Sequence, residues 1–228
     1  MIAVTFDFGQ TLSELDLEFL AARLAERGAR LSPAQAQGES AAAWAAYGAA
    51  KRQGLVAHDA WCTFMRTLLE RSKVDPPERA AELAEWLWTE QPARNLWRKP
   101  IAGMFELVRE LHAAHVPLGV VSNSEGKLSE LCTELGLREC FAAFADSGVL
   151  GVEKPEPAIF QWAAERLGVP CSALIHVGDA WDADIVGAQR VGARAIWFDP
   201  QDDRPLPEGV LTAQSAAEVR RALERFGL

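Results

Sequence analysis

The hydrophobic and polar positions of the chain follow two different periods, which divide the sequence into two kinds of region. Residues 2–6 are apolar and partly β-branched, with no charged residue among them, which predicts a fully buried β-strand. From residue 13 to residue 99 the apolar residues recur with the spacing of amphipathic helices, and no strand pattern interrupts them. After residue 100 helical patterns alternate with short apolar runs. We therefore expect a sheet-containing region that is interrupted by an all-helical insertion.

The helical segment carries four predicted helix starts, each marked by a residue that commonly caps a helix or begins its first turn. These starts lie at Ser13 with Asp16 as a capping box, at Ser32-Pro33, at Asp59 and at Pro76-Pro77. Pro92 and Pro100 flank the stretch that leads back out of the segment. The segment is therefore predicted to be a unit of four helices with a return linker.

The region after residue 100 alternates strands with helices, which is the pattern of βαβ units. The predicted strands cover residues 118–121, a short segment near Phe144, residues 173–177 and residues 193–198. A last amphipathic helix ends near Phe226. Such alternation predicts a parallel sheet with helices on its faces. The expected fold class is α/β, with a parallel-sheet core and an inserted all-helical domain.

Composition narrows the range of partners and compartments. A net charge of −9 over 228 residues argues against nucleic acid or an anionic membrane as a partner, because no basic field is available to bind phosphate backbones. The four cysteines show no Cys-x-x-Cys spacing and no paired histidine, which predicts reduced thiols in a cytoplasmic protein rather than a zinc site. Neither a signal-peptide pattern nor a membrane-spanning apolar run is present in the sequence. No pattern indicates a particular oligomeric state.

Polar residues follow three of the predicted strands. They are Asp7 after the first strand, Ser122-Asn123-Ser124 after the second, and Gly178-Asp179 with Asp182 and Asp184 after the third. One such residue is equally well explained as a helix cap, but several at the carboxyl edge of one parallel sheet indicate an active site. Carboxylates that share a site repel one another unless a proton or a cation lies between them, and oxygen ligands suit Mg²⁺. Lys154, shortly before a predicted helix, could neutralise an anion there.

These residues resemble the four ordered motifs of the haloacid dehalogenase-like hydrolase superfamily. The motifs are Asp7-Phe8-Gly9-Gln10-Thr11-Leu12, Ser122, Lys154, and Gly178-Asp179 with Asp184. The helical segment between the first and second motifs is similar to the branch with a helical cap. The resemblance covers residue 2 to about residue 200. It implies a Rossmann-like core of residues 1–13 and 100–228, with a helical cap of residues 14–99.

By this resemblance Asp7 is the nucleophile, which would form an aspartyl-phosphate with a small phosphorylated metabolite. Ser122 would hydrogen-bond a phosphoryl oxygen with the assistance of Asn123, and Lys154 would pair with both the phosphate and Asp7. A carboxylate can perform such a covalent step when its attacking oxygen is held in line with the leaving group. The resemblance therefore implies a phosphatase with these catalytic and substrate-binding residues.

Mg²⁺ is the cofactor that the resemblance implies. Asp7, Asp179 and the backbone carbonyl of Gly9 would bind the ion directly, and Asp184 would orient its waters. The ion would neutralise the charge of the phosphate during its transfer.

Gly9 departs from the phosphatase pattern, which has a second aspartate two residues after the nucleophile as general acid and base. The dehalogenase and phosphonatase branches also lack this acid, so both remain alternatives. Ala180-Trp181-Asp182 is similar to the fourth motif of the dehalogenases, which work without metal. A phosphonatase needs a Schiff-base lysine from the cap, for which Lys51, Lys73 and Lys99 are the candidates. A non-catalytic phosphate-binding protein is the third alternative.

Overall fold

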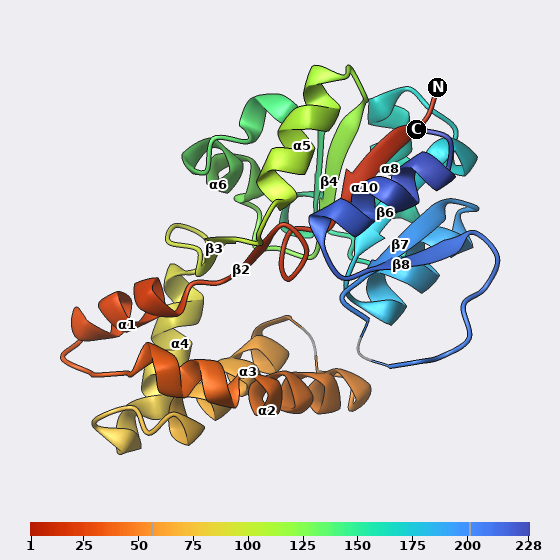
Figure 1. The fold of residues 1–228 in the computed structure, drawn as a ribbon. Helices are drawn as coiled ribbons and strands as arrows, with labels where there is room; N and C mark the ends of the chain where they lie inside the picture. The colour runs from red at the N-terminus through yellow and green to blue at the C-terminus, as the bar shows by residue number, and fades with distance from the viewer. Residues whose placement is uncertain (56, 201) are drawn as a thin grey trace. The chain divides into compact units, whose positions relative to one another are not determined.

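A computed structural model describes residues 1–55, 57–200 and 202–228, and the chain in it forms two compact units (Figure 1). The first unit, which we call the sheet unit, comprises Met1–Glu14 and Trp97–Leu228. The second, the helical unit, comprises Leu15–Leu96. The helical unit is therefore an insertion between the first strand of the sheet unit and the rest of it.

The sheet unit is built on a six-stranded parallel sheet with the order β5-β4-β1-β6-β7-β8. Its strands are β1 (Ala3–Phe6), β4 (Leu118–Ser122), β5 (Ala143–Asp146), β6 (Leu174–Gly178), β7 (Arg194–Phe198) and β8 (Val210–Ala213). In register, Phe6 of β1 lies between Val120 of β4 and Val177 of β6. The chain builds outward from β1 to β5, then returns to β6 on the other side of β1. Ligands of open α/β sheets bind at such a reversal, outside the carboxyl ends of the strands.

Helices cover both faces of the sheet (Figure 1). One apolar cluster joins the sheet to α5 (Met104–Ala113), α6 (Leu128–Glu134) and α10 (Ala216–Arg225). A second cluster, on the other face, contains the apolar side chains of α8 (Pro157–Leu167) and of the short α9 (Gly187–Arg190). A further single turn, α7 (Ser147–Leu150), follows β5. The α/β fold with a parallel sheet, predicted from the alternation of strand and helix patterns, is confirmed, and so is the Rossmann-like core that the family resemblance implied.

Among its described residues the helical unit contains four α-helices, and each packs against the next along the chain. They are α1 (Leu17–Ala25), α2 (Pro33–Arg52), α3 (Ala57–Arg71) and α4 (Ala80–Glu90), the last preceded by a 3₁₀ turn at Pro77–Arg79. Tryptophans fill the interfaces: the rings of Trp44 and Phe64 lie 4.4 Å apart between α2 and α3, and those of Trp61 and Trp88 lie 5.5 Å apart between α3 and α4. Aromatic packing therefore joins the three helices that follow α1.

The structure corrects three local predictions. Ser13 does not cap a helix but begins β2 (Ser13–Leu15), which pairs with β3 (Trp97–Pro100), so two short strands flank the helical segment. The N-cap of α1 is Asp16, whose Oδ1 accepts a hydrogen bond from the backbone N–H of Phe19 at 2.9 Å. Asp59 lies in the first turn of α3 rather than before it. The strands β2 and β3 contain charged residues and so lack the uncharged apolar run that marked β1, and β8 was also missed.

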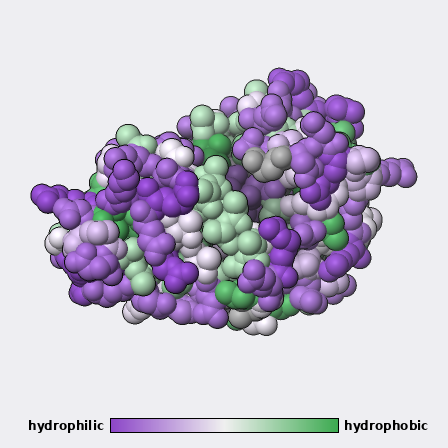
Figure 2. Space-filling view, turned by 90° about the horizontal axis from the view of Figure 1, so that it is seen from below, coloured by the Kyte–Doolittle hydropathy of each residue, from purple (hydrophilic) through white to green (hydrophobic). Residues whose placement is uncertain are grey.

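The face of the molecule drawn in Figure 2 is mostly polar, and its hydrophobic residues form a narrow band and small separate spots. Among the described residues, the large hydrophobic side chains that are exposed are Met1, Val149 and Leu206, and single exposures of this kind are ordinary. No helix within the described ranges is long and apolar enough to cross a membrane.

Candidate active site

The strand β1 places Asp7 at the carboxyl edge of the sheet, beside the end of β6. The backbone N–H of Asp7 donates to the carbonyl of Val177 at 2.8 Å, which continues the strand pairing up to the carboxylate. The chain then turns sharply, because the N–H groups of Leu12 and Ser13 both donate to the carbonyl of Phe8. Asp7 is buried, with 8% of its surface exposed. The side chain therefore sits at the point where the strand order reverses.

Lys154 is the cation of this site. Its Nζ lies 2.6 Å from Oδ1 of Asp7 and 2.6 Å from Oδ1 of Asp184, and only 4% of the residue is exposed. Burial by itself would lower the pKa of this ammonium, but the carboxylates of Asp184 and Asp7 raise it above its usual value. Lys154 therefore stays charged and ties Asp7 to Asp184.

Asn123 holds the loop that carries Lys154. Its side-chain Nδ2 donates to the carbonyl of Lys154 at 3.1 Å, and its Oδ1 accepts from the backbone N–H of Lys154 at 2.7 Å. Both ends of the amide are thus engaged with one residue of another loop. Asn123 was predicted to assist substrate binding, and the contact that the structure gives it is this positioning of Lys154.

Ser122, the last residue of β4, lies beside the same carboxylate. It is buried, with 5% of its surface exposed. Burial raises the pKa of Asp7, and the hydrogen bonds from Lys154 and Ser122 act against that rise.

Asp184 is locked in place by four neighbours. Its Oδ1 accepts from Lys154 and lies 3.2 Å from Nε2 of His176, while its Oδ2 accepts from the backbone N–H of Ala180 at 2.8 Å. A Cβ on Gly178 would lie 2.3 Å from Cγ of Asp184, so only glycine leaves room for this carboxylate. Burial opposes ionisation, yet Lys154 and His176 lower the pKa of Asp184 below its usual value. Asp184 is therefore an ionised, immobile carboxylate.

His176 is a residue of the site that sequence reasoning missed. It lies within the apolar run of β6, is fully buried, and its Nδ1 lies 3.0 Å from the hydroxyl of Thr5. The opposite ring nitrogen faces Asp184. A histidine in the middle of an otherwise apolar buried strand was the available signal, because a buried polar side chain requires partners. His176 supports the carboxylate from inside the sheet.

Asp179 completes a group of three carboxylates, in which ligand oxygens of Asp7, Asp179 and Asp184 all lie within 4.8 Å of one another. The hydroxyl of Thr11 donates to Oδ1 of Asp179 at 3.3 Å. Burial, followed by the charges of Asp184 and Asp7, raises the pKa of Asp179 well above its usual value. Three carboxylates and one lysine leave an excess of negative charge, and an all-oxygen donor set fits a hard divalent cation.

The remaining predicted residues lie apart from this group or at its margin. Gly9 lies two residues after Asp7, and the space beside its Cα faces the indole of Trp97. Asp182 is exposed on the π-helix Trp181–Val186, although Asp184 in the same turn is buried. Ser124 pairs through its backbone with Ser147 of α7. Lys99 belongs to the sheet unit and pairs with Glu14 at 2.7 Å, whereas Lys51 and Lys73 lie in the helical unit.

Asp179→Asn is expected to stabilise the protein in the absence of divalent cations. The amide keeps the bond from Thr11 but removes a carboxylate that is disfavoured by burial and by its neighbours. A gain of about 1 kcal/mol, or a rise of about 2–4 °C in the unfolding temperature, is expected in EDTA at neutral pH. A carboxyl whose pKa is raised on folding costs stability above its usual pKa, so the gain should vanish below about pH 4.

Thermal unfolding by circular dichroism measures this difference, with Asp182→Asn as the matched control because Asp182 is an exposed carboxylate nearby. An unfolding temperature that is unchanged or lower in Asp179→Asn would contradict the repulsion among the three carboxylates.

Comparison with known proteins places this geometry in a family. Residues 3–192 match the family model described as haloacid dehalogenase-like hydrolase. The chain is 32% identical over 186 residues to the phosphoserine phosphatase of Thermus thermophilus, covering 77% of this chain and 72% of that protein. The fold is also similar to a solved structure of the haloacid dehalogenase-type (HAD) hydrolase YfnB from Bacillus subtilis. The TM-score is 0.68 at 22% identity, and the match covers 97% of this chain and 98% of that one. A 2-haloacid dehalogenase from Pseudomonas syringae gives a TM-score of 0.63 at 25% identity over 100% of both.

Proposed function

Because the chain belongs to the haloacid dehalogenase-like hydrolase family, we propose that it is a Mg²⁺-dependent phosphatase of small phosphorylated metabolites that acts through an aspartyl-phosphate on Asp7. The observation that carries the proposal is the buried ion pair of 2.6 Å between Asp7 and Lys154, set beside Asp179 and Asp184 at the carboxyl edge of the sheet. In the same proposal residues 1–13 and 100–228 are the catalytic core and residues 14–99 the helical cap. The same proposal places the enzyme in the cytoplasm, which the four free cysteines support.

Asp7 would attack the phosphorus atom with a carboxylate oxygen, and the bond from phosphorus to the leaving oxygen would break. Lys154 and Ser122, which already contact Asp7, would donate hydrogen bonds to the phosphoryl oxygens. Water would then hydrolyse the aspartyl-phosphate, which returns the carboxylate and releases inorganic phosphate. Asp7 and Ser122 lie at strand ends, and Asn123 holds the loop that carries Lys154, so these groups are positioned before substrate binds.

Mg²⁺ would be held by Asp7, Asp179 and the carbonyl of Gly9, with Asp184 beside them. The donor set supports this assignment, because three carboxylates face one lysine within a partly buried site. When bound, the ion would supply positive charge that stabilises the charge of the transferred phosphoryl group.

Removal of divalent cations is expected to lower phosphate release by at least about 10²-fold, since the metal contributes several kcal/mol to such a transition state. The measurement is phosphate release from an aryl phosphate and a panel of phosphorylated metabolites, in Mg²⁺ and in EDTA. Restoration by added Mg²⁺ controls for loss of folded protein. Equal rates in EDTA and in Mg²⁺ would contradict the proposed cofactor.

A metal-free 2-haloacid dehalogenase is the second candidate function. Gly9 favours it, because a glycine there supplies no acid to a departing alcohol, whereas halide departs without protonation. In that reaction Asp7 would attack carbon and release halide. Chloride release from a 2-haloacid in EDTA, without phosphate release in Mg²⁺, would replace the first proposal with this one.

A further inference from the structure

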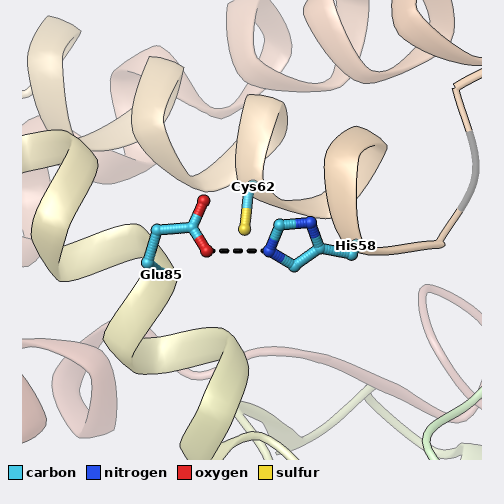
Figure 3. Close-up of side chains that lie close together, drawn as sticks. All are labelled: His58, Cys62 and Glu85. Atoms are coloured by element: carbon cyan, nitrogen blue, oxygen red, sulfur yellow. Dashed lines mark hydrogen bonds and ion pairs between the residues drawn. The ribbon is translucent and has the colours of Figure 1, made fainter.

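A second group of metal-binding side chains lies within the helical unit. His58 and Cys62 come from α3 and Glu85 comes from α4, and one ligand atom of each lies within 4.8 Å of the other two. Figure 3 shows the imidazole, the thiol and the carboxylate pointing toward one another from the two helices. The three residues supply nitrogen, sulfur and oxygen, and none of them belongs to the carboxylate group beside Asp7.

Helix geometry and packing bring these atoms together. His58 and Cys62 are four residues apart on α3, so their side chains project from the same face one turn apart. The helix α4 packs against this face, where the ring of Trp88 meets the ring of His58 edge-on at 5.5 Å. The aromatic contact restricts the imidazole, and Glu85 lies one turn before Trp88 on the same helix. The arrangement therefore depends on the packing of two regular helices rather than on a loop.

The imidazole of His58 has the orientation that metal-binding histidines commonly show. Its Nδ1 lies 2.8 Å from Oδ1 of Asp59, and its Nε2 lies 2.7 Å from Oε2 of Glu85. In metal sites the ring nitrogen that does not bind metal usually donates to a carboxylate, which fixes the ring and raises its basicity. Asp59 occupies that position, so Nε2 is directed at the centre of the group.

The group is open on one side. Cys62 is 9% exposed, whereas the side chains of His58 and Glu85 are 43% and 59% exposed. Solvent can therefore reach an ion bound to the buried thiol and occupy a further coordination position. Asp59 and Glu85 also place two carboxylates beside the imidazole, and their negative charge favours a cation.

We propose that His58 Nε2, Cys62 Sγ and a carboxylate oxygen of Glu85 form a binding site for a divalent cation of the zinc class, with water as the fourth ligand. Nitrogen and sulfur donors select Zn²⁺ or Co²⁺ over Mg²⁺, which prefers oxygen. Ligand atoms around a tetrahedral Zn²⁺ lie roughly 3.5 Å apart given bonds of about 2.0–2.3 Å. Oε2 of Glu85 lies 2.7 Å from Nε2 of His58, so the exposed Glu85 side chain must move slightly away from the ring to admit the ion. Binding replaces the thiol proton and the Nε2 proton, both of which pass to solvent.

The bound cation would link α3 to α4 and stabilise the helical unit. The cysteine spacing gave no indication of such a site, because the ligands are one histidine and one cysteine on a helix and a carboxylate 27 residues from the histidine. The proposal does not depend on the phosphatase chemistry proposed for Asp7, and either can fail without the other.

Titration of the full-length, freshly reduced protein with Co²⁺, in excess Mg²⁺ to occupy the oxygen-only site, tests the proposal. We expect a near-ultraviolet thiolate-to-cobalt charge-transfer band that saturates at one equivalent and is bleached by Zn²⁺. Cys62→Ser should abolish the band, and Glu85→Gln should weaken Co²⁺ binding by at least about tenfold. Cys171→Ser, which changes a half-buried thiol of the sheet unit, should leave the band intact.

Two results would contradict the proposed cation site. One is the absence of a charge-transfer band in the wild-type protein, and the other is a band that persists undiminished in Cys62→Ser. Glu85→Gln alters an exposed side chain, so it tests the site even if the buried Cys62→Ser variant does not fold. Hydrogen exchange gives an independent readout: Zn²⁺ should slow exchange in α3 and α4 of the wild type, and unchanged exchange there would also contradict the link between the helices.

Discussion

Asp7→Asn is expected to lower kcat for an aryl phosphate by on the order of 10⁴-fold or more, with the fold intact. The amide has nearly the shape of the carboxylate but is not a nucleophile, so no aspartyl-phosphate can form. Lys154 keeps its ion pair with Asp184 at 2.6 Å, and therefore the ammonium is not left alone in a buried site. The loss should appear in kcat rather than as loss of folded protein.

The measurement is steady-state turnover in Mg²⁺, together with the circular dichroism spectrum. An acid-quench assay detects protein that carries a labelled phosphoryl group. Asp182→Asn is the matched control, since it removes one exposed carboxylate of the π-helix Trp181–Val186 and should keep wild-type turnover. If the Asp7→Asn variant retained more than about one hundredth of the wild-type kcat, Asp7 would be excluded as the nucleophile.

The second large effect concerns the leaving group. Glycine at position 9 supplies no general acid, and a positioned acid contributes about 10²–10⁴-fold when an alkoxide must be protonated as it departs. We therefore expect kcat/KM to fall by about this factor from aryl or acyl phosphates to alkyl monoesters. The aspartyl-phosphate should also accumulate, because no side chain at this position activates the attacking water.

Gly9→Asp should narrow the difference in kcat/KM between aryl or acyl phosphates and alkyl monoesters. A Cβ at position 9 would lie 3.4 Å from Cδ1 of Trp97, which is an ordinary van der Waals contact, so the backbone can accept a side chain here. Gly9→Ala is the matched control, because it adds the Cβ without the carboxyl. In this variant kcat/KM should still fall steeply as the pKa of the leaving group rises. The measurement is kcat/KM for a series of phosphates of rising leaving-group pKa in the three proteins. A flat series in the wild type would show that another residue donates the proton.

The arrangement of the strand ends was predictable from the sequence because it depends on local patterns. Uncharged apolar runs mark the buried strands, and the residue that ends each run stands at the carboxyl edge of a parallel sheet. Asp7 and Ser122 were located in this way, and Asp179 follows a third such run. Lys154 was included because of its place among the motifs, and the structure brings its Nζ to Asp7 across a separation of 147 residues.

Short elements and individual contacts were not predictable in the same way. The strands β2 (Ser13–Leu15) and β3 (Trp97–Pro100) contain charged residues, so neither shows the uncharged apolar run by which a buried strand is recognised. Asn123 is hydrogen-bonded to the backbone of Lys154, a pairing that the sequence around either residue does not indicate. Long-range hydrogen bonds depend on where two loops meet, and hydrophobic periodicity carries no information about that.

The sequence by itself therefore determined the α/β class, the helical insertion and the edge at which polar groups gather, because these follow from burial along a continuous segment. The tertiary structure alone decided that Asp184 lies against Gly178 with His176 beneath it, and that Glu85 faces His58 and Cys62 from the next helix. These groups interact over a few ångströms, so their chemistry depends on the packing of elements distant in sequence or on the exact turn of the backbone between them.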